Sequence, residues 1–201
     1  MFAFAIASAV LAATASALPT LSARQNPCNA LGAGSTDSLS YNFTIAAIDM
    51  DAPDNSTGAP LALTTGPPGT SGEASTWWIS TISASYQSDF PTFSLVGGAL
   101  IPNPGPHEQG LAVYDNAVNP GSELEFTVTL PSSGLSNDAT YCAVSDANGY
   151  ATIAVNERTD KFALCEATGS AYIVVYEPST TNDGLYQADT CAPKRLRAVR
   201  A

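Results

Sequence analysis

The amino-acid sequence predicts one all-β domain, built as an antiparallel β-barrel or β-sandwich. Apolar, β-branched and aromatic residues come in short runs, and these runs are separated by Gly, Pro, Asn and Asp. Beyond residue 17, no stretch keeps the apolar period of a helix. Because the runs recur at the short spacing of strands joined by turns, we expect a single barrel or sandwich.

About eleven strands are expected from these runs. Their ranges are 40–48, 61–65, 76–83, 92–96 continuing at 99–101, 111–114, 124–130, 141–144, 151–155, 162–165, 172–176 and 194–199. Every second residue from Leu124 to Leu130 is apolar, which predicts one strand face in the core and one in water. The pairs Gly97-Gly98 and Asn148-Gly149 predict tight hairpin turns, because these residues accept positive φ angles.

The first and last of these strands are expected to pair. Pairing of residues 40–48 with residues 194–199 would close the sheet and remove its open edges, which are the usual route to aggregation of β proteins. A β-trefoil is one way to build such a closed sheet from short strands. No threefold internal repeat is visible in the sequence.

Residues 1–17 have the features of an export signal. The segment is apolar, uncharged and rich in Ala, and it ends on Ala15-Ser16-Ala17, the small-x-small pattern that a signal peptidase cleaves. Polar residues return too early for a membrane anchor, and no apolar tail follows for a glycolipid anchor. We therefore expect a secreted, unanchored protein with a flexible segment at 18–27 and one domain at 28–201.

Export would place the four cysteines in an oxidising compartment, where an even number indicates disulfides. Four cysteines allow three pairings, and the sequence does not choose among them. We favour Cys142 with Cys165, across neighbouring hairpins, and Cys28 with Cys191, across the two ends of the domain. Zinc is the weaker alternative because no two cysteines have zinc-knuckle spacing, so we expect no metal and no cofactor.

The distribution of charge argues against nucleic acid and anionic membranes as partners. The formal net charge is −11, and all 18 acidic residues precede Lys194. Such a surface repels polyanions. Four of the seven basic residues lie in the last eight positions, where Leu196 and Val199 indicate a final strand. We expect a monomer.

Asn42 and Asn55 are candidate glycosylation sites. Asn42 begins Asn-Phe-Thr and Asn55 begins Asn-Ser-Thr, and both match the acceptor pattern for N-linked glycans in exported proteins. If they carry glycans, both side chains lie at the surface.

No catalytic or metal-binding set of residues stands out. His107 is the only histidine, and its Pro- and Gly-rich loop predicts an exposed side chain. Glu123 and Glu125 have the spacing of a glycoside hydrolase pair, but they lie on the polar side of an alternating strand, which favours solvated charges. Residues 49–55 hold three aspartates and an amide suited to calcium, although acidic turns after strands are common.

Trp77 and Trp78 are the candidate carbohydrate-binding residues. Adjacent residues in a strand point to opposite faces, so one Trp is expected in the core and the other at least half exposed. An exposed Trp on a secreted β protein can stack on a sugar ring. The alternative, which we favour, is that both pack structurally, under the loop at residues 66–72.

Several segments of the chain occur in a recognisable order. They are YNFTIAAIDMDAPDNSTGAPLAL, FSLVGGALI, FALC, AYIVVYEP and CAPKRLRAV. In that order they resemble small secreted proteins of filamentous fungi, and loosely the PhiA-type cell-wall proteins. The resemblance implies an extracellular or cell-wall surface protein without assigned catalytic residues. We expect a non-catalytic wall-associated protein whose partner is cell-wall polysaccharide; the alternatives are a carbohydrate-binding module or lectin and, third, a glycoside hydrolase.

Overall fold

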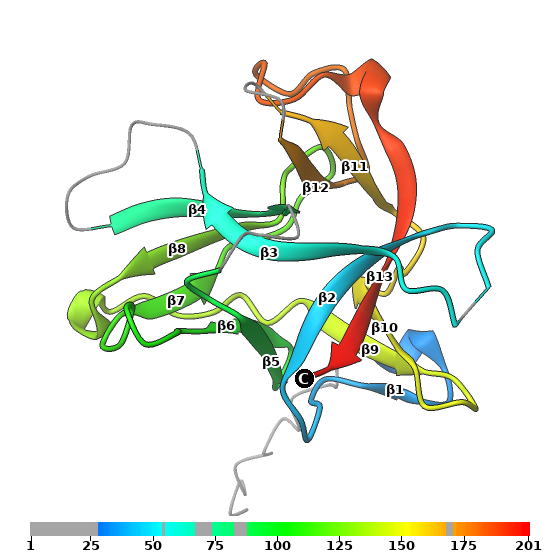
Figure 1. Ribbon diagram of the computed structural model, residues 1–201, viewed down its shortest axis with the longest axis horizontal. Helices are drawn as coiled ribbons and strands as arrows, with labels where there is room; N and C mark the ends of the chain where they lie inside the picture. The colour runs from blue at the N-terminus through cyan, green and yellow to red at the C-terminus, as the bar shows by residue number, and fades with distance from the viewer. Residues whose placement is uncertain (1–27, 54, 67–73, 83–87, 168–170) are drawn as a thin grey trace, which may run out of the picture.

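The computed structural model describes residues 28–201, apart from residues 54, 67–73, 83–87 and 168–170 (Figure 1). The expected export signal and the segment 18–27 lie outside the described residues. The strands are β1 (Ser35–Thr36), β2 (Phe43–Asp49), β3 (Ala59–Thr65), β4 (Ala74–Thr81), β5 (Thr92–Val96), β6 (Ala99–Asn103), β7 (Ala112–Asp115), β8 (Glu125–Thr129), β9 (Tyr141–Ser145), β10 (Ala151–Val155), β11 (Phe162–Glu166), β12 (Tyr172–Tyr176) and β13 (Ala192–Arg200). Three short 3-10 helices are η1 (Asn29–Leu31), η2 (Pro131–Ser133) and η3 (Ala188–Thr190).

Six of the strands close into an antiparallel barrel (Figure 1). Their order is β2, β3, β4, β12, β11 and β13, and β13 pairs again with β2. This closing pair is matched along its length, from Asp49 opposite Lys194 to Phe43 opposite Arg200. The expected pairing of the first and last predicted strands is confirmed, and the fold is a barrel.

Apart from β1, the outer strands come from the middle of the chain. The consecutive pairs β5–β6, β7–β8 and β9–β10 join the barrel at β2, β4 and β13 respectively, and β1 pairs with β9. The barrel strands therefore form two blocks of three, one before β5 and one after β10. A threefold repeat would distribute barrel strands evenly along the chain, so this order is not that of a β-trefoil.

The strands follow the expected runs closely. β5, β10 and β12 begin and end at the expected residues. The hairpin between β5 and β6 turns on Gly97 and Gly98, whose φ angles are 57° and 85°. A Cβ on Gly98 would lie 2.7 Å from the Ala139 carbonyl oxygen, so only glycine fits there. The expected strands do not include β1, because its two residues, Ser35 and Thr36, contain no apolar run.

The main hydrophobic core is formed by buried side chains of the barrel strands and of the outer strands together. Phe43 of β2 and Phe93 of β5 are opposite one another and stack with ring centroids 6.3 Å apart. Leu124, Phe126 and Val128 are buried as their alternation predicts. Leu130, in contrast, is 57% exposed, because β8 has ended at Thr129 and the alternation no longer applies.

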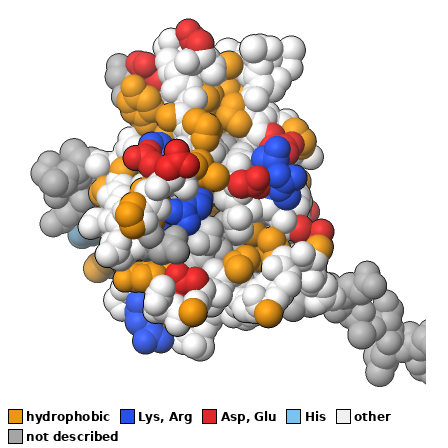
Figure 2. Space-filling model, turned by 90° about the vertical axis from the view of Figure 1, so that its right-hand side faces the viewer, with side chains coloured by type: hydrophobic (Ala, Val, Ile, Leu, Met, Phe, Trp, Pro, Cys, Tyr) orange, Lys and Arg blue, Asp and Glu red, His pale blue; other side chains and the backbone are white. Residues whose placement is uncertain are grey.

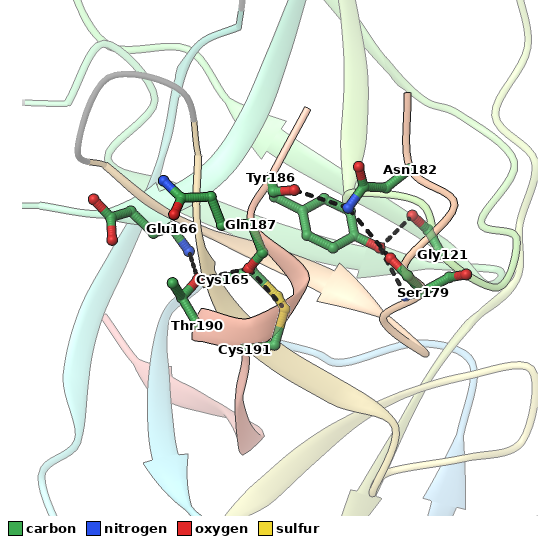
Figure 3. The surroundings of a disulfide bond; sticks show 9 residues. All are labelled: Gly121, Cys165, Glu166, Ser179, Asn182, Tyr186, Gln187, Thr190 and Cys191. Carbon is green, nitrogen blue, oxygen red and sulfur yellow. Dashed lines mark hydrogen bonds between the residues drawn. A yellow bond between two sulfur atoms is a disulfide. The ribbon is translucent and has the colours of Figure 1, made fainter. Parts of the chain in front are cut away.

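A second, smaller hydrophobic cluster lies between the sheet and the loop that joins β12 to β13, residues 177–191. Trp78 packs there with Ile173 and with Tyr186 of the loop. The Tyr186 hydroxyl donates to the Gly121 carbonyl oxygen at 3.0 Å and accepts from the Ser179 amide at 2.9 Å (Figure 3). The loop is therefore held against the barrel by a buried aromatic ring with a satisfied hydroxyl.

Two disulfides are present, as expected, but the favoured pairing is wrong. Cys28 pairs with Cys142, and Cys165 pairs with Cys191 (Figure 3). Cys28 precedes β1, which pairs with β9 and so places Cys28 beside Cys142 of β9, with 5.7 Å between their Cα atoms. Each bridge thus joins a strand to a segment that packs on it. Strand pairing decides the connectivity, and the pairing of β1 with β9 was not visible in the sequence.

Removing the two bridges should destabilise the domain unequally. The Cys28–Cys142 bridge spans 114 residues and the Cys165–Cys191 bridge spans 26. Restriction of the unfolded chain predicts losses of about 5 and about 3.5 kcal/mol in the free energy of unfolding for the two Cys→Ala double variants. Urea unfolding measures both losses. A larger loss for the Cys165→Ala, Cys191→Ala protein, or peptide mapping that finds Cys28 bonded to Cys191, would contradict this account.

Candidate functional site

The candidate site begins with the side-chain alternation of β13. Leu196 and Ala198 point into the core, so Arg195 and Arg197 point to the outer face. The Arg195 guanidinium donates to the Ala52 carbonyl oxygen at 2.6 Å. The Arg197 guanidinium donates to the Ser56 carbonyl oxygen at 2.9 Å. The basic end of the chain is therefore a barrel strand that holds the β2–β3 loop, residues 50–58, against the wall of the barrel.

Two tyrosines stack on arginines of the same strand. The Arg197 Cζ lies 4.6 Å from the centre of the Tyr150 ring, and the Arg200 Cζ lies 4.5 Å from the centre of the Tyr41 ring. Both distances are within the range of cation–π attraction. Tyr41 precedes β2, and Tyr150 ends the β9–β10 turn. The strand β13 therefore brings together rings that are far apart in the sequence.

The Tyr150 ring is positioned by its turn. The Asp146 carboxylate accepts hydrogen bonds from the amides of Asn148 at 2.8 Å and of Tyr150 at 2.9 Å. Gly149 has a φ of 83°, as the Asn-Gly pair predicts. The ring is 38% exposed, so part of its face is open to solvent.

A groove of about 730 Å³ lies between these segments. It is lined by Tyr41 and by residues 55–57, 148–150 and 197–200. The β2–β3 loop and the β9–β10 turn project from the same side of the barrel (Figure 1). On that side, basic and acidic side chains lie beside one another and among hydrophobic side chains (Figure 2). The groove has the size of a small-ligand site. We call it the Tyr41–Tyr150 groove.

The groove offers the contacts that a sugar chain needs. Aromatic rings stack on the apolar faces of sugars, and amides, hydroxyls and guanidinium groups hydrogen-bond to sugar hydroxyls. The sequence did not predict this groove, because its residues lie in four separate segments and only strand pairing brings them together. The one signal in the sequence was the alternation of Arg195 and Arg197 in β13. Two arginines on one face of a strand indicate that a neighbouring segment supplies hydrogen-bond acceptors to them.

The structure buries both candidate tryptophans. Trp77 and Trp78 point to opposite sides of β4, as expected, but each is only 8% exposed. Trp77 packs in the main core, with its ring 5.3 Å from that of Phe90. Trp78 lies under the β12–β13 loop. Both tryptophans therefore pack structurally, which is the favoured alternative, and the expectation of a half-exposed Trp is wrong because the β12–β13 loop covers the second face. Residues 67–73, part of the loop considered for this role, lie outside the described residues.

The two candidate glycosylation residues are both exposed, and both lie near the groove. Asn55 lines the groove directly. Asn42 follows Tyr41, and its side-chain oxygen accepts a hydrogen bond from the Ser94 hydroxyl at 3.0 Å. Whether either asparagine carries a glycan stays a prediction.

The remaining candidates of the sequence are spread apart. His107 is exposed, as expected. Glu125 is half-buried and accepts a hydrogen bond from the Asn116 amide at 2.5 Å. Glu123, expected in solvent, is 6% exposed, and burial, with the charges of Glu125 and Asp183, raises its pKa. Neither glutamate lines the groove.

The calcium alternative for residues 49–55 is not supported by the structure. Asp49 forms an ion pair with Lys194, opposite it in the closing strand pair. Asp54 lies outside the described residues. No group of three metal-ligating side chains occurs in the part of the chain that the structure describes.

Asp115 is the most perturbed carboxyl with a defined pKa. Burial raises its pKa to about 6, although the amides of Leu100 and Asp138 donate to its two oxygens at 3.2 and 3.1 Å. The pKa of the buried Tyr141 hydroxyl is also raised, by burial and then by the charge of Asp115. Asp115 is 2% exposed and Tyr141 is fully buried, and neither lines the groove.

Comparison with models of known families, with curated proteins and with solved structures finds no match to this chain. Within the described residues, no helix is long and apolar enough to cross a membrane.

The contribution of Asp115 to the stability of the domain should decrease as the pH rises from about 4 to about 6. Because folding raises the pKa of Asp115 above 3.8, the protonated carboxyl favours the folded state, and this contribution is lost as the pH passes the folded value. In the parent protein, this contribution makes the free energy of unfolding lower at pH 7 than at pH 4 by on the order of 2 to 3 kcal/mol, and Asp115→Asn should remove that difference. Urea unfolding across this range measures it. Asp51→Asn, at an exposed carboxyl, is the matched control, and an Asp115→Asn protein with the same pH profile as the parent would refute the assignment.

Proposed function

We propose that this chain is a non-catalytic extracellular protein that associates with cell-wall polysaccharide, and that the sugar chain binds in the Tyr41–Tyr150 groove. The observation that carries the proposal is the pair of tyrosine–arginine stacks on one strand, Tyr150 on Arg197 and Tyr41 on Arg200. The two disulfides support an oxidising, extracellular location. The apolar segment 1–17 supports export.

The groove suits binding more than cleavage. Glycoside hydrolysis uses a pair of carboxyl groups on either side of the scissile bond. The described residues that line the groove supply rings, amides, hydroxyls and guanidinium groups, and no carboxylate is among them. A sugar in this groove would be stacked and hydrogen-bonded without an acid beside its glycosidic oxygen.

The groove is built in advance of any ligand. Arg197 is 5% exposed, and its guanidinium lies over the Tyr150 ring and donates to the Ser56 carbonyl oxygen. Rings and donors held in place lose little entropy when a ligand binds. A preformed surface of this kind fits a protein that attaches to a repetitive polymer through weak, rigid contacts.

Removing either ring should weaken attachment to the wall. Loss of one aromatic stacking contact predicts affinity for purified wall polysaccharide that is about 3- to 10-fold lower for Tyr150→Ala and for Tyr41→Ala. Co-sedimentation with purified wall measures this affinity.

Tyr172→Ala is the matched control, because Tyr172 is 42% exposed and lies outside the groove. Trp78→Phe tests the alternative that the tryptophans of β4 bind the sugar chain. Wall binding that survives both groove variants and falls in the Trp78 variant would overturn the assignment of the groove, and a parent protein that does not bind wall would overturn the proposed function.

A further inference from the structure

We infer that the Tyr41–Tyr150 groove is also the docking site of the protein's own N-linked glycan, carried on Asn55, and that this glycan regulates access to the groove. The inference rests on the proposed function, because it uses the same sugar-binding surface. It adds a modification site and a regulator. The ligand is the first few sugars of an N-glycan, tethered at the rim of the groove.

The geometry places the attachment point in the groove itself. Asn55 is exposed, begins Asn55-Ser56-Thr57, and lines the groove together with both following residues. Tyr150 lines the same groove and is 38% exposed. A sugar chain that starts at the Asn55 amide therefore begins inside the surface that we assign to sugar binding.

The loop that carries Asn55 is fixed, so the glycan would start from a defined position. The Ser56 carbonyl oxygen accepts from Arg197 at 2.9 Å, and the Ser56 amide donates to the Pro53 carbonyl oxygen at 3.0 Å. Gly58 has a φ of 72°, and a Cβ there would lie 2.7 Å from the Ala47 carbonyl oxygen. The turn is therefore specified at both ends of the acceptor sequence.

Tethering makes even weak binding effective. A ligand joined by a short flexible link has an effective concentration in the millimolar range. A sugar–tyrosine site with a dissociation constant of about 1 mM would then be half-filled or more by the attached glycan. External polysaccharide would have to displace that glycan. The apparent affinity of the polysaccharide for the groove would therefore fall in proportion to the fraction of grooves that the attached glycan fills.

Asn42 provides an internal comparison. It is exposed and next to Tyr41, but it does not line the groove, and its side-chain oxygen is bonded to Ser94. A glycan on Asn42 would start outside the groove. Its removal should leave the groove as it was.

The experiment uses the full chain secreted from a eukaryotic host, and glycopeptide mass spectrometry first measures occupancy of Asn55. Nitration of Tyr150 by tetranitromethane then reports whether the groove is covered, with Tyr172 as the internal reference. We expect Tyr150 to react about two- to tenfold more slowly in the glycosylated parent than in Asn55→Gln or Thr57→Ala proteins. Asn42→Gln retains Asn55 and lies outside the groove, so it should behave like the parent. Thr57→Ser retains the acceptor sequence, so Tyr150 should stay protected in that protein. Endoglycosidase treatment of the folded parent removes the glycan without a mutation, and it should raise the nitration rate of Tyr150 to that of the Asn55→Gln protein.

An unoccupied Asn55, or equal Tyr150 reactivity with and without its glycan, would overturn the inference. Wall co-sedimentation of the same proteins separates it from the proposed function. If Tyr150 becomes reactive in Asn55→Gln and that protein still does not bind wall, the proposed function fails and the glycan docking stands. If the parent and the Asn55→Gln protein bind wall equally well and Tyr150 is equally reactive in both, the groove binds polysaccharide without this regulation.

Discussion

The pairing of β2 with β13 supports both the barrel and the candidate site. It joins the first and last barrel strands in chain order, and without it the six-stranded sheet would have two open edges. The same pairing turns Arg195 and Arg197 outward, beneath the loop that leaves β2. Carbonyl oxygens of that loop accept hydrogen bonds from the two guanidinium groups. Closing the barrel therefore also builds one wall of the Tyr41–Tyr150 groove.

The charge pattern acquires a structural meaning from this arrangement. The whole chain has a formal net charge of −11, and most of its few basic residues lie on one strand, β13. Lys194 pairs with Asp49, and Arg197 and Arg200 lie on tyrosine rings. The cations thus hold loops and aromatic side chains in place. Buried carboxyls at Asp115 and Glu123, whose pKa values are raised, favour the folded state at mildly acidic pH.

Much of the fold could be predicted from the sequence, whereas the site could not. Short apolar runs and the Gly97-Gly98 and Asn148-Gly149 turns indicate strands and hairpins, because their signals are local. The disulfide pairing depends on β1, which has two residues and no apolar run. Trp78 is covered by a loop that follows it by about a hundred residues, so no local pattern shows its burial. The groove joins four distant segments, and only the register of β13 places them together.

The most direct measurement of the central claim is an NMR titration of the isotope-labelled Asn55→Gln protein with soluble cell-wall oligosaccharides. If the sugar chain binds in the groove, concentration-dependent shifts should be confined to residues 55–57, 148–150 and 197–200 and to the Tyr41 ring, the surface built on the closing strand. Shifts centred on β4 around Trp77 and Trp78, or no shift with any oligosaccharide, would contradict it.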